Sequence, residues 1–171
     1  MMPRHGEGHE SAHDKLKRAQ TLEEILETAL GFEATARDFY AELAGRVSKP
    51  LRELVEELAE EEKEHYRLFS ELKANPDIAG ALKELVERPA EDHRFSDFIQ
   101  KPDLGEAPDD QAILQYALAR EDAAAKQYAA LAQSTPEGPV RDLFTHLAKE
   151  ELAHKAELEK RYYEIVHSGG V

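Results

Sequence analysis

The sequence predicts an all-α protein, a four-helix bundle of two pseudo-symmetric antiparallel helix hairpins with a long crossover between the second and third helices. More than half of its 171 residues are Ala, Glu, Lys, Leu or Arg, a composition typical of helical proteins. Its eight prolines leave four long proline-free stretches, and proline is tolerated in the first turn of a helix but not in its interior. Within each stretch, apolar residues recur every three or four positions, as they do along one face of a helix.

The first hairpin is predicted over residues 21–74. Thr21 and Glu24 have the spacing of a capping box, in which each side chain hydrogen-bonds the backbone of the other, so the first helix begins there. The second helix begins near Ser48, with Pro50 in its first turn, and ends before the next proline. The connection between them is short, so the two helices are expected to be antiparallel neighbours.

The second hairpin is predicted over residues 109–167. Asp109 and Asp110 are both favourable N-cap residues, so the third helix is expected to begin near one of them. Thr135 is the expected N-cap of the fourth helix, with Pro136 at its first position. The short connection again predicts antiparallel neighbours.

The rest of the chain is assigned to a tail and a crossover. Residues 1–19 are polar and predict a flexible N-terminal tail, while residues 20–168 are expected to form the bundle domain. Within this domain, residues 75–108 form the crossover. It begins with a predicted short helix over residues 77–88 and continues through a Pro- and Asp-rich strip.

Composition excludes several classes of function. A formal net charge of -14 argues against nucleic acid or an anionic membrane as a partner, because both repel carboxylates. No apolar run approaches the roughly 20 residues of a membrane span, and the start of the chain does not resemble a signal peptide. These features predict a cytoplasmic protein. The chain has no cysteine, which excludes disulfides, Cys-ligated metal sites and thiol nucleophiles within it.

Six polar residues interrupt the apolar seams that the four helices are expected to turn toward one another: Glu33, Glu62, His65, Glu121, Glu151 and His154. In each hairpin, the two glutamates lie at nearly equal distances along the chain from the connection. Equal distances in an antiparallel pair mean equal heights. All six residues are therefore expected to meet in one polar layer at the middle of the bundle.

Four ionised carboxylates in one buried layer need cations, because buried charge is very unfavourable unless it is paired or bound to metal. Two divalent cations would neutralise them, and the imidazole nitrogens would complete the coordination. Carboxylate oxygens with two imidazoles and no thiolate suit iron or manganese, with zinc as an alternative.

Two observations favour this metal site over a plain bundle with buried salt bridges. No Lys or Arg lies on the predicted seams before the last turns. Four Glu-x-x-His matches occur, and those near the ends of the chain are treated as coincidental because Glu is abundant. Glu121 follows Glu33 by 88 residues, and the second central match, Glu151 with His154, follows the first, Glu62 with His65, by 89. These nearly equal offsets predict two duplicated halves.

The constellation resembles the ferritin-like di-iron carboxylate proteins, in which two helices each supply a Glu and the other two each supply a Glu-x-x-His pair. Within that group, the sequence is most similar to the rubrerythrin family. The resemblance is carried by the runs EEEKEH at 60–65 and EELAH at 150–154, and by the pairs Glu33…Tyr40 and Glu121…Tyr128. It covers residues 21–74 and 109–166 and implies a ferritin-like bundle.

The resemblance implies a centre of two iron ions held by the six residues of the polar layer, with manganese or zinc as substitutes. Glu62 and Glu151 would bridge the ions, and all six residues would take part in catalysis through the metals. The implied activity is that of an oxidoreductase acting on hydrogen peroxide or dioxygen, as a peroxidase or a ferroxidase. A homodimer is the implied assembly.

Two departures from the family affect this chemistry. Rubrerythrins carry a Cys-ligated rubredoxin domain that delivers electrons, so a chain without cysteine would need a separate electron-donor protein for a reductive reaction. The family also has an additional Glu one turn beyond the third-helix ligand. This sequence has Ala124 there, which removes the residue used for redox-dependent ligand exchange.

Spacing also points to residues around the layer. Tyr40 and Tyr128 lie two turns beyond the glutamates of the first and third helices, where each either donates a hydrogen bond to a carboxylate of the opposite half or packs as a core aromatic. Glu61 and Glu150 either orient a histidine or lie on exposed helix faces, and the exposed face is the preferred assignment. His146 is assigned no role.

Two other functions remain open at this point. The first is a non-catalytic protein that binds or delivers iron. The second is a metal-free helical interaction module. Turnover of oxidant by the iron-loaded protein would separate the enzyme from the first alternative, and metal content would separate it from the second.

Overall fold

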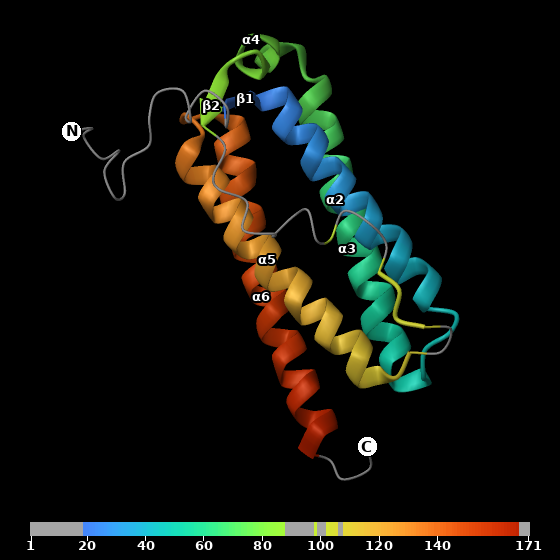
Figure 1. The fold of residues 1–171 in the computed structure, drawn as a ribbon. Helices are drawn as coiled ribbons and strands as arrows, with labels where there is room; N and C mark the ends of the chain where they lie inside the picture. The colour runs from blue at the N-terminus through green and yellow to red at the C-terminus, as the bar shows by residue number, and fades with distance from the viewer. Residues whose placement is uncertain (1–18, 88–97, 99–101, 106–107, 168–171) are drawn as a thin grey trace, which may run out of the picture.

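Four long helices dominate the computed structural model, which describes residues 19–87, 98, 102–105 and 108–167 (Figure 1). They pair as two hairpins, α2 with α3 and α5 with α6, and the hairpins lie side by side. The bounds of the helices are Leu22–Leu43 for α2, Lys49–Ala74 for α3, Asp110–Ser134 for α5 and Pro139–His167 for α6. The prediction of an all-α bundle of two hairpins is confirmed.

Two of the predicted helix starts are confirmed by their caps. The backbone N–H of Glu24 donates to the hydroxyl of Thr21 at 3.1 Å, and the backbone N–H of Thr21 donates to the carboxylate of Glu24 at 3.0 Å. This pair is the predicted capping box. At the start of α5, the carboxylate of Asp109 accepts a hydrogen bond from the backbone N–H of Ala112 at 2.7 Å.

The fourth helix begins later than predicted, at Pro139 and not at Pro136. Gly138 has a φ of +151°, a conformation that residues with side chains rarely adopt and that a helix cannot contain, so the turn must end before the helix starts. The first helical hydrogen bond runs from the N–H of Asp142 to the carbonyl of Gly138 at 3.0 Å. The hydroxyl of Thr135 donates back to the carbonyl four residues earlier, at 2.7 Å, and does not cap α6.

The helix predicted over residues 77–88 is wrong in its second half. Pro76–Ile78 form a 3₁₀ turn (η1) and Ala79–Leu82 form the short helix α4, after which the chain extends into strand β2, Leu85–Glu87. This strand pairs antiparallel with β1, Ala19–Thr21, next to α4 (Figure 1). The middle residue of β2 is buried in the core. Local periodicity cannot reveal a strand partner so distant in the sequence.

The described residues include only part of the predicted tail and of the rest of the crossover. The tail predicted over residues 1–19 lies outside the described residues except for Ala19, which belongs to β1. In the crossover, the ring of Phe98 packs on Tyr116 of α5 with centroids 5.6 Å apart. Leu104 packs against the core near the start of α5. These two residues therefore cover α5.

The described core consists of two apolar clusters, one on each side of the polar layer along the bundle. Burying a large apolar side chain contributes about 1.5–3 kcal/mol, so these clusters hold the helices together around the polar residues. The first cluster includes Leu26, Phe69, Tyr128 and Phe144, and the second includes Leu51, Leu58, Leu114 and Leu158.

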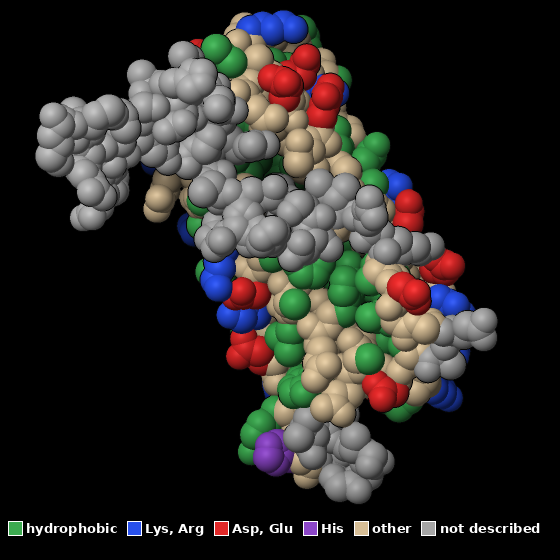
Figure 2. All heavy atoms as spheres, in the orientation of Figure 1, with side chains coloured by type: hydrophobic (Ala, Val, Ile, Leu, Met, Phe, Trp, Pro, Cys, Tyr) green, Lys and Arg blue, Asp and Glu red, His purple; other side chains and the backbone are tan. Residues whose placement is uncertain are grey.

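The surface is mixed in charge. On the face drawn in Figure 2, acidic and basic side chains lie along both edges of the bundle with hydrophobic ones between them. One such pair joins α3 to α2, where Lys73 lies 2.9 Å from Glu27. Exposed pairs of this kind contribute only about 0–1 kcal/mol each, so stability comes chiefly from the core. Among the described helices, none is long and apolar enough to cross a membrane.

Candidate metal centre

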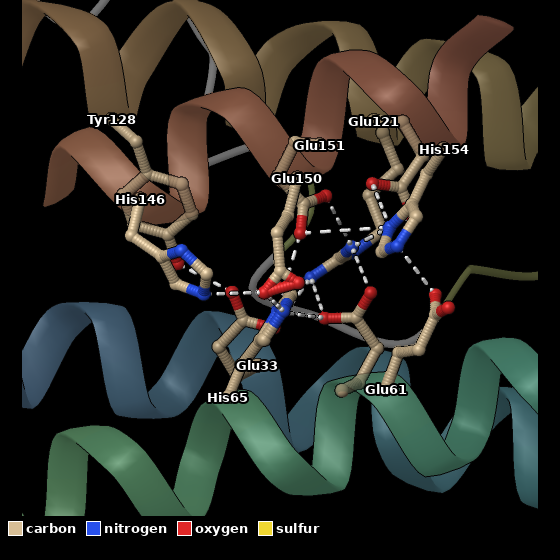
Figure 3. Close-up of polar contacts among 11 residues, drawn as sticks. Glu33, Glu61, His65, Glu121, Tyr128, His146, Glu150, Glu151 and His154 are labelled. Carbon is tan, nitrogen blue, oxygen red and sulfur yellow. Dashed lines mark hydrogen bonds and ion pairs between the residues drawn. The ribbon is translucent and has the colours of Figure 1, made fainter. Parts of the chain in front are cut away.

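All four long helices contribute to one buried layer in the middle of the bundle (Figure 3). The glutamates of the layer are fully buried, His65 is 2% exposed and His154 is 14% exposed. The structure thus brings together the six residues that the sequence placed in the polar layer. They are one glutamate from each of α2 and α5 and one Glu-x-x-His pair from each of α3 and α6: Glu33, Glu121, Glu62 with His65, and Glu151 with His154.

The ligand atoms of these residues fall into two overlapping groups. Each residue offers one oxygen or nitrogen, and within a group these atoms all lie within 4.8 Å of one another. The first group is Glu33, Glu62, His65 and Glu151, and the second is Glu62, Glu121, Glu151 and His154. Each group has three carboxylates and one imidazole, and the two groups share Glu62 and Glu151. Adjacent groups that share two carboxylates are suited to a pair of bridged cations.

Several of these ligand atoms make no hydrogen bond of good geometry in the described part of the chain: Nδ1 of His65 and His154, Oε2 of Glu121, and both oxygens of Glu151. Their contacts with one another are ion pairs, such as the 3.2 Å between Nδ1 of His65 and Oε1 of Glu151. A buried polar atom left unsatisfied costs about 1–3 kcal/mol. Carboxylate oxygens and imidazole nitrogens are ligands for divalent ions such as iron and manganese. The donor set therefore fits a metal centre that would satisfy these atoms.

The other ring nitrogen of each histidine faces a carboxylate from the opposite half. Nε2 of His154 lies 2.7 Å from Glu61, and Nε2 of His65 lies 3.6 Å from Glu150, which also contacts His146 at 2.7 Å (Figure 3). The sequence analysis assigned Glu61 and Glu150 to exposed faces. Both are partly exposed. Glu61 reaches across the hairpins and directs Nδ1 of His154 toward the polar layer, whereas Glu150 lies beyond hydrogen-bond distance of His65 and pairs more closely with His146.

The two tyrosines near the layer differ in their contacts. The hydroxyl of Tyr128 donates to Glu33 in the opposite half of the bundle (Figure 3). The hydroxyl of Tyr40 is equally buried, and it makes no hydrogen bond to any described residue. Burial raises the pKa of Tyr40 well above its usual value, and the charge of nearby Glu121 adds to the effect. The expected hydrogen bond across the halves is therefore made by one of the two tyrosines.

A basic residue that the sequence analysis missed lies in the middle of the polar layer. Arg120 of α5 is 0% exposed, and its two terminal nitrogens donate to the two oxygens of Glu62 at 3.1 and 3.2 Å. They also donate to Glu33 and Glu121 at 3.3 Å each, and Nη1 lies 3.8 Å from Glu151. No Lys or Arg lies on the predicted seams before the last turns, but Arg120 reaches the carboxylates from a position just outside the seam of α5.

Arg120 lies one position before the seam that the sequence predicted for α5, on a second buried stripe. This stripe also advances by alternating steps of four and three, through Ile113, Ala117, Arg120, Ala124, Gln127 and Leu131. The matching stripe in α2, at an offset of 88 residues, is Ile25, Ala29, Phe32, Ala36, Phe39 and Leu43. A search for a second stripe that repeats in both halves would have found Arg120.

The pKa values of the carboxylates are perturbed by burial and by one another. Burial opposes the ionisation of Glu33, but hydrogen bonding with Glu62 and the charges of Arg120 and His65 lower its pKa to about 2. Burial raises the pKa of Glu62 and of Glu121, and in each case the charge of a neighbouring carboxylate raises it further. The layer therefore has one strongly acidic carboxyl group and two that resist ionisation.

The histidines are strongly basic in the protein alone. Burial by itself would lower the pKa of both, but their carboxylate partners raise the pKa of His65 to about 11 and that of His154 to about 10. Both imidazoles therefore carry a proton near neutral pH unless a metal ion replaces it. Together with Arg120 they provide three positive charges for the four glutamates.

Comparisons with known proteins agree with this geometry. A family model described as Rubrerythrin matches residues 6–95, which is just over half of the chain. Among solved structures, the chain is similar to a hypothetical protein, Pfu-1136390-001, from Pyrococcus furiosus, with 24% identity, a TM-score of 0.62 and coverage of 85% of this chain and 90% of that one. This likeness shows a shared fold, and no curated protein matches the sequence significantly. On the strength of the family match, which spans both helices of the first hairpin, the chain belongs to the rubrerythrin family.

Proposed function

We propose that this protein is a di-iron carboxylate oxidoreductase that acts on hydrogen peroxide or dioxygen, as a peroxidase or a ferroxidase. The observation that carries the proposal is the pair of overlapping donor groups that share Glu62 and Glu151. Membership of the rubrerythrin family supports it. The two shared glutamates would bridge the iron ions, and each ion would keep one further glutamate and one histidine from its own group.

The chain's own part in this chemistry is to hold the ligands and to limit access of water. Bound iron supplies the exchange of electrons with the oxidant. The polar layer lies between two apolar clusters, and Tyr128 holds Glu33 in place by a hydrogen bond. The 171 residues contain no cysteine, so electrons for a reductive reaction must come from a donor with a redox group of its own.

A small cavity beside His154 offers a route to the layer. It has a volume of about 40 Å³, and its lining includes Leu54, Leu58, Glu61 and Leu158. A cavity of this size admits a molecule about as large as water. A space of this size can hold dioxygen or hydrogen peroxide beside His154.

Anaerobic titration of metal-free protein with ferrous iron tests the centre. We expect saturation at two iron ions per chain, and then an absorbance change when hydrogen peroxide or dioxygen is added in separate experiments. Repeated consumption of peroxide in the presence of a chemical reductant would support the peroxidase. A single stoichiometric oxidation without turnover would contradict an enzyme and would support an iron-handling protein.

Variants of the shared glutamates provide the control. Glu62→Ala and Glu151→Ala should each abolish binding of two ions, because each removes a ligand from both groups. Glu60→Ala, in the same helix but 77% exposed, should bind iron like the wild type. Equal iron stoichiometry in all three variants would contradict the assignment of the site.

A metal-free bundle held by buried ion pairs is the second candidate, and Arg120 is the observation that favours it. With both histidines protonated, the layer has three positive charges for its four glutamates, so ion pairing alone goes far toward neutrality. A wild-type protein that binds no ferrous iron, and whose melting temperature is unchanged by a chelator, would establish this alternative.

A further inference from the structure

We propose that Arg120 is a built-in counter-cation of the polar layer, which holds the glutamates together in the metal-free protein and competes with metal ions for them. This role rests on the proposed dinuclear centre and concerns how tightly that centre binds metal ions. It is a positioning role: the guanidinium acts on the carboxylates and not on the oxidant.

Arg120 pairs most closely with Glu62. Both terminal nitrogens of Arg120 donate to this carboxylate, at 3.1 and 3.2 Å, so both of its oxygens are engaged. Two parallel hydrogen bonds are the strong form of pairing between a guanidinium and a carboxylate. Glu62 is also one of the two carboxylates that belong to both donor groups. Metal ions bridged by Glu62 must therefore share or displace these hydrogen bonds.

Arg120 lies between the two donor groups. It donates to Glu33, which belongs to one group, and to Glu121, which belongs to the other, at 3.3 Å each. A divalent ion in either group would lie close to the guanidinium. Like charges repel strongly in a buried site of low dielectric constant. The same ligands should therefore bind metal more tightly without Arg120.

The positive charge of Arg120 is permanent. A histidine can lose its proton to become a metal ligand, whereas a guanidinium stays protonated in proteins. Arg120 is 0% exposed, and its Cζ lies 4.1 Å from the ring centroid of Phe32. The ring packs against the guanidinium and helps to keep it in the layer. The positive charge thus remains beside the glutamates whether or not metal binds.

The same contacts stabilise the metal-free protein. Removing one partner from a buried network of ion pairs is strongly destabilising, because the remaining charges are left unpaired. Arg120 contacts all four glutamates of the layer within 3.8 Å. Its removal should therefore weaken the metal-free fold and raise the affinity for metal at the same time. A purely structural arginine would produce the first effect without the second.

The test compares the wild type with Arg120→Gln in two measurements, using Mn²⁺ as the probe because it resists oxidation by air. Calorimetric titration should show Mn²⁺ binding at least about tenfold more tightly to Arg120→Gln. The melting temperature of metal-free Arg120→Gln should fall by about 5 °C or more. Arg120→Lys retains the charge but not the paired donors, so its affinity for Mn²⁺ should stay near that of the wild type.

Arg67→Gln is the matched control, because Arg67 also pairs with two carboxylates, Glu64 and Glu71, on the exposed face of α3. It should change neither Mn²⁺ affinity nor the metal-free melting temperature by a comparable amount. If metal-free Arg120→Gln does not fold, saturating Mn²⁺ should refold it, since the ions replace the lost charge. Failure to refold under those conditions overturns the proposal.

The outcomes separate this inference from the proposed function. If the wild type binds two Mn²⁺ ions and Arg120→Gln binds them equally or more weakly, the role of Arg120 is overturned and the dinuclear centre stands. If neither protein binds Mn²⁺, both the proposed dinuclear centre and the competition between Arg120 and metal ions are contradicted. If only Arg120→Gln binds, the competition is supported and the wild type is not a metalloprotein.

Discussion

The guanidinium carbon of Arg120 lies 4.1 Å from the ring centroid of Phe32, and the two residues occupy equivalent positions in the two halves of the bundle. In a duplicated structure, two equivalent residues can contact each other only close to the pseudo-two-fold axis that relates the halves. The duplication is therefore broken at that axis. One half provides an aromatic face, and the other provides the cation that packs on it.

This contact predicts that Phe32→Ala is among the more damaging core substitutions. The ring is 0% exposed and lies against both Arg120 and Tyr128, so its loss leaves a cavity and removes a cation–π contact. The free energy of unfolding should fall by about 3–5 kcal/mol, measured by urea denaturation. Leu85→Ala, at a position that is 66% exposed, should change it by less than about 0.5 kcal/mol. Similar losses in both variants would contradict the packing.

The two buried tyrosines predict a contrast between equivalent substitutions. Tyr128→Phe removes the hydroxyl that donates to Glu33 and should lower the free energy of unfolding by about 1–3 kcal/mol. Tyr40→Phe should have a smaller effect or none, because its hydroxyl makes no hydrogen bond within the described ranges. Chemical denaturation of the two variants under identical conditions measures the difference. Equal losses would show that the two halves are more alike at this point than the structure indicates.

The histidines predict how the stability of the metal-free protein depends on pH. In the folded protein the pKa of His65 is about 11 and that of His154 about 10, both above the value of about 6.5 for an unfolded chain. Their contribution is therefore fully present below about pH 6.5 and is lost as the pH rises through the folded-state values. The raised pKa values of Glu62 and Glu121 act in the same direction.

The free energy of unfolding of the metal-free protein should accordingly decrease from pH 6.5 to pH 9, as measured by denaturation at a series of pH values. Leu85→Ala is the control, since it changes a non-ionisable side chain that is 66% exposed and should leave the shape of this profile unchanged. A metal-free stability that stays constant or rises over this interval would contradict protonated imidazoles in the polar layer.

The carboxylate that faces His154 predicts a graded effect on metal binding. Glu61 lies 2.7 Å from Nε2 of His154 and orients the ring so that Nδ1 faces the other ligands. Glu61→Ala should weaken Mn²⁺ binding by about 10-fold or more while the helix content stays unchanged. Glu57→Ala, one helical turn earlier on α3, provides the comparison in calorimetric titration. Unchanged affinity in Glu61→Ala would limit Glu61 to a surface contact.

Much of the fold follows from local features of the sequence. Helix period, proline positions and caps act over a few residues, so the four long helices and the caps at Thr21 and Asp109 were predictable. The layer of glutamates and histidines was also visible, because polar residues on an otherwise apolar seam stand out. The strand over Leu85–Glu87 was not predictable in this way, since its partner lies near the beginning of the chain.

The sequence by itself determined the four long helices, apart from the start of α6, and which glutamates and histidines face inward, because both depend on spacing within one helix. Only the tertiary structure decided what lies opposite them. Arg120 reaches the carboxylates because its part of α5 faces α2, where it contacts Phe32 and Glu33. Glu61 reaches His154 because the two hairpins meet there. Such contacts depend on the geometry between helices, which the period of a single helix does not specify. That geometry places a permanent cation among ligands suited to metal.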